Sequence, residues 1–400
     1  MEGDVGVRKS IGALICASAV VAAASWPVAQ GGGTSPGAPA QEQRGRGAGA
    51  LQRDLLYAAV PGRTNDIGFG GVGILVFDAA RHFRFVKRIP TWEYPAYEQP
   101  ENVKGVAVSV SLGMIYISTI KRLAAWDLIT EKKVWEQTYD GNCCDRMALS
   151  PDGRTMYVPS FEGPNWYVID AKTGSLIKSL PAPASQGAHN TIWSPDGTKV
   201  FMAGLRSNTM SIADAKTHAV VQTVGPFANN VRPFTVNGAG TLIYANVNDL
   251  LGFQIGDVRT GKVIQTVQVQ GYGWARERLA GHGCPSHGVA LSPDEKEVWV
   301  VDGANSSIHI FDNTVMPPKQ VKSIKVRDQP FWLTWSANGK WVYAASGDII
   351  DAQTKQVIAG LKDEMGRDVE GEKVVEVLFQ DGKLVKAVDQ FGVGQVRGTE

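Results

Sequence analysis

The sequence predicts an all-β protein, a seven-bladed β-propeller of four-stranded antiparallel blades, from two repeating features. An aspartate recurs at intervals of roughly 40 to 55 residues, which is a period typical of propeller repeats. A turn sequence of the Ser-Pro-Asp-Gly type precedes most of these aspartates by about twenty residues. The repeating aspartates are Asp78, Asp127, Asp170, Asp214, Asp257, Asp312 and Asp351.

Each repeat reads as a strand, a hairpin turn, a second strand, a loop, a third strand, the aspartate turn and a fourth strand. The turn at 150–153 is typical of a tight hairpin. The segment after each such turn is rich in β-branched and aromatic residues, which favours a strand. We expect these second strands at 155–159, 199–203, 242–246, 297–301 and 341–345. Seven units of this kind fit between Leu55 and Asp363.

The first unit, 55–89, supplies only the second, third and fourth strands of a blade. The segment 373–379, followed by a turn at 380–382, can supply the missing first strand from the C-terminus. Such an exchange joins both chain ends in one blade and removes free sheet edges. The segment 383–388 either adds a further strand or packs over that blade.

Segments such as Thr-Met-Tyr-Val-Pro-Ser at 155–160 and Thr-Leu-Ile-Tyr-Ala-Asn-Val at 241–247 resemble the YVTN-type seven-bladed β-propeller repeat family. The resemblance covers about three quarters of the chain and is specific for the fold. It implies no activity, because that family shares no catalytic motif and propellers host enzymes, electron-transfer modules and binding scaffolds.

The chain has 400 residues, and the repeat uses nearly all of them, so we expect one propeller over 51–400. Its 40 basic and 39 acidic residues give a net charge of +1, which argues against nucleic-acid binding. We expect a monomer.

The N-terminus has the features of a secretory signal peptide. Arg8 and Lys9 precede an apolar run at 11–21, and an Ala-x-Ala cleavage pattern follows at 22–24. We expect a signal peptide at 1–24, a disordered Gly/Ala/Pro linker at 25–50, and a secreted or periplasmic protein with no membrane span after cleavage. Retention of the apolar run as an anchor is the alternative.

The residues just before the first strand of each blade should converge on one rim of the central channel. Alignment of the repeats places mostly ionisable or polar residues there, which suits a small-molecule or protein-partner site. The alternative is a polar rim that encloses water. The predicted rim residues are Lys104, Asp145, Arg146, His189, Asn190, Arg232, His287, Phe331 and Trp332.

The repeat is interrupted by an insertion at 271–287, which we expect to act as a lid on the same rim. It contains His282, Cys284 and His287, whose ligand types suit a divalent metal such as zinc or copper. The alternative is a tight loop in which the histidines bond to the backbone.

The predicted mature chain has three cysteines, Cys143, Cys144 and Cys284, an odd number for an oxidising compartment. A vicinal disulfide, a bridge from either neighbour to Cys284, or no disulfide are all open. A vicinal disulfide is also a feature of the eight-bladed pyrroloquinoline-quinone alcohol dehydrogenases. The segment 125–135 resembles one tryptophan-docking motif of that family, with Glu131 where its glycine belongs.

Three functions follow from these observations. The first is a secreted propeller that binds a small ligand or protein partner through the channel rim. The second is a metal-assisted lyase or hydrolase on a carboxylated or sugar-like substrate, with His189 or His287 as base or metal ligand and Arg232 or Lys104 holding an anionic group. The third is a quinone-linked redox protein. Nucleophile-elbow and phosphate-loop motifs are absent from the sequence.

Overall fold

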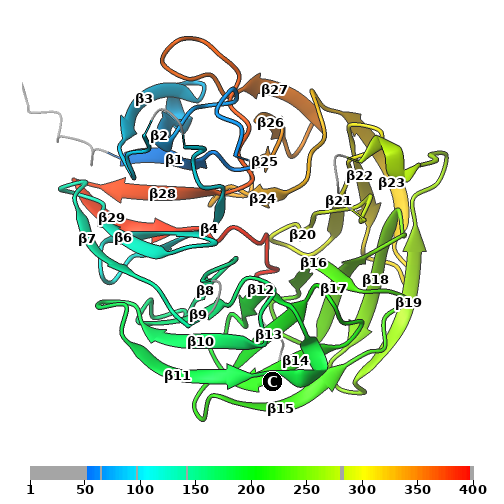
Figure 1. The fold of residues 1–400 in the computed structure, drawn as a ribbon. Coiled ribbons are helices and arrows are strands. Elements are labelled where there is room, and N and C mark those ends of the chain that lie inside the picture. Colours follow the sequence, from blue (N-terminus) through cyan, green and yellow to red (C-terminus); the bar gives the residue numbers. More distant parts are fainter. Residues whose placement is uncertain (1–51, 64, 96–97, 141–142, 280–282, 397–400) are drawn as a thin grey trace, which may run out of the picture. The chain divides into compact units, whose positions relative to one another are not determined.

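The computed structural model describes residues 52–63, 65–95, 98–140, 143–279 and 283–396 (Figure 1). The predicted signal peptide at 1–24 and linker at 25–50 lie outside these residues and stay predictions. Within the described part of the chain, no helix has the length and apolar character needed to cross a bilayer.

The described residues form seven antiparallel sheets, which confirms the predicted seven-bladed β-propeller. Six sheets have four strands in chain order, and the innermost strands of neighbouring blades contact one another around the channel (Figure 1). The described chain has little helix, only the short 3-10 turns η1 (Ala79–Arg81), η2 (Pro183–Ser185) and η3 (Arg276–Arg278).

The strands of these six blades are given from the channel outward. The second blade has β4 (Val103–Ser109), β5 (Met114–Thr119), β6 (Leu123–Asp127) and β7 (Lys133–Gln137), and the third has β8 (Ala148–Leu149), β9 (Thr155–Pro159), β10 (Asn165–Asp170) and β11 (Leu176–Pro181). The fourth blade has β12 (Ala188–Trp193), β13 (Lys199–Gly204), β14 (Met210–Asp214) and β15 (Ala219–Val224), and the fifth has β16 (Val231–Val236), β17 (Leu242–Val247), β18 (Gly252–Asp257) and β19 (Lys262–Gln268). The sixth blade has β20 (Val289–Leu291), β21 (Glu297–Asp302), β22 (Ser307–Asp312) and β23 (Lys319–Lys325), and the seventh has β24 (Leu333–Trp335), β25 (Trp341–Ala344), β26 (Asp348–Asp351) and β27 (Gln356–Gly360).

The first blade joins the two ends of the described chain. Its strand order is β29-β28-β1-β2-β3, formed by β1 (Gln52–Val60), β2 (Gly73–Asp78), β3 (Arg84–Ile89), β28 (Val374–Gln380) and β29 (Lys383–Ala387). Strand β28 pairs with β1 from Gln52↔Gln380 to Ala58↔Val374 and so supplies the missing first strand. The predicted closure is confirmed, and β29 extends this blade to five strands.

The repeating aspartates each end the third strand of their blade, as expected. The Asp127 carboxylate accepts hydrogen bonds from the backbone N–H groups of Ile129 (2.9 Å) and Thr130 (2.6 Å). A carboxylate that bonds the backbone two and three residues ahead fixes a tight turn, so the residue type is set by the turn. Side-chain bonds of the same kind form at Asp170, Asp214, Asp257, Asp312 and Asp351.

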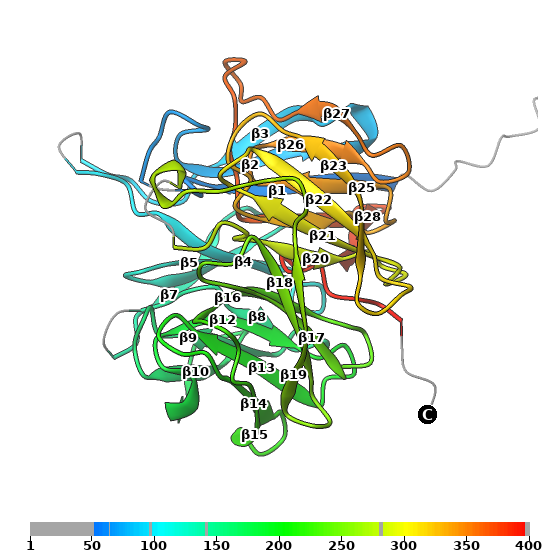
Figure 2. The ribbon, with the colours of Figure 1, turned by 90° about the vertical axis from the view of Figure 1, so that its right-hand side faces the viewer.

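The chain after β29, residues 388–396, fills one end of the channel. The Gln390 amide donates to the Met147 carbonyl (3.2 Å), and the Gly392 carbonyl accepts from Thr235 Oγ1 and the Leu291 N–H (both 2.9 Å). Figure 1 shows this red segment entering the middle of the ring. In the side view of Figure 2 it lies on the right, whereas the cyan connection that contains residues 91–95 extends to the left.

Candidate functional site

The predicted rim residues lie where the innermost strands begin, at the channel end away from the hairpin turns. Asp145 and Arg146 lie just before β8, with Met147 between them and the strand, and His189 and Asn190 lie at the start of β12. An isolated parallel bridge joins Arg146 to Asn190, so the two blades meet at this point. The structure therefore brings these four residues together.

Asp145 and His189 form a buried carboxylate–imidazole pair. His189 Nδ1 bonds to Asp145 Oδ2, and Asp145 Oδ1 accepts the Arg146 backbone N–H at 2.9 Å. The Asp145 side chain is 1% exposed and the His189 side chain 14% exposed. Because the carboxylate holds Nδ1, it fixes the orientation of the ring, as an aspartate does for a histidine that transfers protons.

Arg146 crosses the channel and is almost fully buried, at 3% exposure. Its guanidinium carbon lies 3.3 Å from the centre of the Trp332 ring, and Nη2 donates to Glu372 Oε2 at 3.2 Å. Burial lowers the pKa of Arg146 to about 10. The negative charges of Glu372 and Asp145 act in the opposite direction and make this shift smaller. Among the described residues, Arg146 Nε and Nη1 and both amide atoms of Asn190 make no hydrogen bond.

Lys373 adds a second buried cation beside Glu372. Its ammonium donates to the same Glu372 oxygen and to the Gly62 carbonyl (2.5 Å). Burial, with Arg146 and Lys104 as nearby like charges, lowers the pKa of Lys373 to about 7 although Glu372 raises it. One carboxylate therefore serves two basic side chains.

Lys104 and Arg232 are partly exposed on this rim. Lys104 Nζ lies 4.9 Å from the centre of the Phe161 ring. Arg232 Nε donates to Asn248 Oδ1 at 2.5 Å, and burial lowers the pKa of Arg232. Neither side chain forms an ion pair within the described residues.

The predicted metal ligands are only partly described, because His282 lies outside the described residues. Cys284 is fully buried, its thiol donates to the Val247 carbonyl (3.3 Å), and burial raises the pKa of this thiol to about 12. His287 Nδ1 lies 3.2 Å from the Phe331 carbonyl oxygen. Within the described residues no group of three His, Cys, Asp or Glu side chains could hold a metal, so this triplet stays a prediction.

The neighbouring cysteines Cys143 and Cys144 form a disulfide, and Cys284 is free. The disulfide directly precedes Asp145 and lies among buried residues of the second and third blades. Glu131, which stands where the quinone dehydrogenase motif has glycine, has φ of +59°. That backbone conformation is the one glycine adopts most easily, but the ring has seven blades where those enzymes have eight.

The insertion joins β19 to β20 and is held by neighbouring loops. Arg276 forms an ion pair with Asp249, and Asn305 donates to the Gly273 carbonyl at 2.9 Å. The Tyr272 ring packs on His309, with 4.5 Å between ring centres. These contacts fasten the described part of the insertion to the two blades that it connects; its role as a lid stays a prediction.

The alignment of the repeats did not identify several rim residues that belong to the first and seventh blades. Arg63 Nη1 bonds to Asp328 (2.7 Å) and Glu370 (2.9 Å), and Glu372 and Lys373 pair with Arg146 as described above. A signal for the last two was present, since Glu372 directly precedes the predicted closing strand 373–379 and Lys373 begins it, as other rim residues lie at the start of theirs.

The chain matches no protein-family model, and no curated protein is similar enough to it to count as a relative. Its resemblance to the YVTN-type repeat family therefore stays a prediction.

Proposed function

We propose that the protein binds a small anionic ligand, a carboxylate or phosphate compound, at the channel end that begins the innermost strands. One observation carries the proposal, the presence of rim cations without a carboxylate partner beside buried polar atoms without a hydrogen bond. The rim cations Arg63, Arg146 and Lys373 are paired with the carboxylates Asp328, Glu370 and Glu372, and Asp145 is paired with His189. The other two rim cations, Lys104 and Arg232, form no ion pair in the described chain.

The ion pairs of the rim favour a bound anion over bound water alone. Glu372 is shared between Arg146 and Lys373, and the Asp145 carboxylate is directed to His189. Lys104 and Arg232 have no carboxylate partner in the described chain. An anion that enters would gain charge-assisted hydrogen bonds from groups already fixed in place, which are the strong kind.

Unsatisfied polar atoms point to the same place. A buried donor without a partner costs about 1 to 3 kcal/mol, and more when it is charged, so such atoms mark positions where a partner binds. Arg146 (3% exposed) and Asn190 (1% exposed) carry four of them. Their burial favours a small ligand over a protein partner, because a protein surface cannot reach into the channel.

Export from the cytoplasm fits the disulfide between Cys143 and Cys144, since disulfides persist mainly in oxidising compartments. We therefore propose a secreted or periplasmic binding protein, in line with the signal-peptide pattern at 1–24.

A second candidate is a hydrolase or lyase in which His189 acts as the general base. The Asp145–His189 pair favours it, because a carboxylate that orients an imidazole is a common arrangement for proton transfer. Turnover of carboxylated sugars or their esters, lost in His189→Gln with ligand affinity retained, would establish this candidate.

The binding proposal is tested by titrating citrate, inorganic phosphate and glucose into the protein in a thermal-shift assay. We expect the two anions to raise the melting temperature at millimolar concentration or below, and glucose to have no effect. Lys104→Met should weaken anion binding about tenfold or more, because a charged hydrogen bond is worth about 1.5 to 3 kcal/mol.

The matched control is Lys172→Met, which removes an exposed lysine from an aspartate turn and the same unit of net charge. Equal weakening by both variants would mean that only the overall charge matters. No stabilisation of the wild-type protein by either anion would contradict the proposal.

A further inference from the structure

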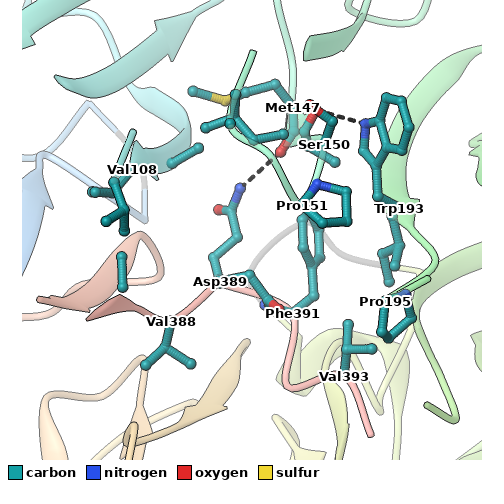
Figure 3. A pocket seen from close by; sticks show the side chains of 18 of the residues that line it. Val108, Met147, Ser150, Pro151, Trp193, Pro195, Val388, Asp389, Phe391 and Val393 are labelled. Atoms are coloured by element: carbon teal, nitrogen blue, oxygen red, sulfur yellow. Dashed lines mark hydrogen bonds between the residues drawn. The ribbon is translucent and has the colours of Figure 1, made fainter. Parts of the chain in front are cut away.

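A cavity of about 770 Å³ opens on the opposite face, beside the hairpin turns (Figure 3). The turns of the second, third and fourth blades form one side, and the segment 387–395 forms the other. This volume lies in the range of pockets that hold small organic ligands. The cavity is separate from the rim site, because it is bounded by the segment that fills this end of the channel.

The walls are mainly apolar. Val108, Met147, Pro151, Trp193 and Phe391 line the cavity, and Figure 3 shows them around it. The Trp193 indole N–H donates to the Ala148 carbonyl at 3.2 Å, which fixes the ring. An aromatic or aliphatic body would therefore find a preformed surface here.

The charged side chains that line the cavity in the described chain are acidic. Asp152 and Asp389 are the charged residues among the described residues that line it, and no Lys, Arg or His does so. The Asp152 carboxylate stabilises its own hairpin turn, because it accepts hydrogen bonds from the Ser150 hydroxyl and the Arg154 backbone N–H.

Asp389 differs from Asp152. It accepts the Phe391 backbone N–H at 2.6 Å but forms no ion pair in the described chain. The Asp389 side chain is exposed, so a ligand that enters the cavity can reach it. Because the Asp389 carboxylate lines a mainly apolar cavity and has no cationic partner in the described chain, a ligand with a cationic group would complement it.

We propose that this cavity binds a small organic amine, with its ammonium group against Asp389 and its apolar or aromatic body against Trp193 and Phe391. The ammonium pairs with the carboxylate, and either ring can add a cation–π contact. The protein would then carry two sites of opposite charge preference at the two ends of its channel. The amine site does not depend on the rim proposal.

The test is isothermal titration calorimetry with 2-phenylethylamine and with 2-phenylethanol, its neutral counterpart of nearly equal shape. The wild-type protein should bind one amine per chain, at least tenfold more tightly than the alcohol. Asp389→Asn keeps the oxygen that accepts the Phe391 N–H but removes the charge, and should weaken amine binding at least tenfold. Asp152→Asn, from the same cavity, should leave the affinity within about twofold.

Equal affinity for the amine and the alcohol would overturn the proposal, as would no amine binding by the wild-type protein. Amine affinity that survives Asp389→Asn but falls in Asp145→Asn would place the amine at the rim and also contradict it. The amine-to-alcohol comparison needs no variant, so it decides the matter even if Asp389→Asn folds poorly.

Discussion

Glu376 on β28 and Asp54 on β1 form a carboxyl pair inside the blade that closes the ring. Glu376 is 1% exposed and accepts hydrogen bonds from the Tyr343 hydroxyl (2.8 Å) and the Ala337 N–H. Burial, followed by the Asp54 carboxyl, raises the pKa of Glu376 to about 8. Burial also raises the pKa of Asp54. The folded state therefore favours a proton on this pair.

The consequence is a loss of stability as the pH rises. A carboxyl whose pKa is raised on folding stabilises the protein fully below its unfolded pKa and loses that contribution as the pH passes its folded pKa. For Glu376 the window runs from about 4.5 to about 8. That difference corresponds to on the order of 5 kcal/mol.

Glu376→Gln should remove most of this dependence. The glutamine oxygen can accept the Ala337 N–H while its amino group donates to the Tyr343 hydroxyl, so both partners stay satisfied. Melting temperatures measured from pH 5 to pH 8 should fall less in the variant than in the wild-type protein. At pH 8 the variant should be the more stable of the two.

Lys373 acts in the opposite direction, because its pKa is lowered to about 7 and its contribution to stability is gained as the pH rises above that value. It is present in both proteins, so their difference isolates Glu376. Glu277→Gln, an exposed position in η3, is the control for net charge. If the wild-type protein and Glu376→Gln show the same change between pH 5 and pH 8, the reasoning is wrong.

Two further predictions concern buried groups. Phe391→Ala should lower the free energy of unfolding by about 3 to 5 kcal/mol and lower the melting temperature, because this 4% exposed ring packs against Trp332. The control Val396→Ala, at an exposed position, should change stability little. Equal losses of stability in the two variants would refute a packing role for the channel segment. In protein produced without residues 1–24, Cys284 should resist a thiol reagent in the native state and react once per chain after unfolding without reductant, since the thiol is buried and its pKa is about 12. Three reactive thiols would contradict the disulfide.

The fold could be predicted because its signals are local. Asp127 and its counterparts set turns within three residues, and the expected strand at 155–159 has the bounds of β9. The closing strand was predicted at 373–379 and lies at Val374–Gln380. Each of these features depends on neighbours in sequence or on the repeat itself.

The channel contents could not be predicted in the same way. Residues 388–396 have no repeat pattern, and their partners, such as Met147 and Thr235, lie more than a hundred residues away. Arg146 was predicted to line the rim, but its stacking on Trp332 depends on how the ring places two distant blades across the channel. Such pairings follow from closure and not from spacing along the chain.

The most direct test of the central claim is a crystal structure of the protein soaked in selenate, a tetrahedral dianion whose selenium gives an anomalous signal. We predict an anomalous peak at the channel end, within hydrogen-bond distance of Lys104, Arg146 or Asn190. Peaks confined to the outer surface, with none at this end of the channel, would contradict the anion-binding account.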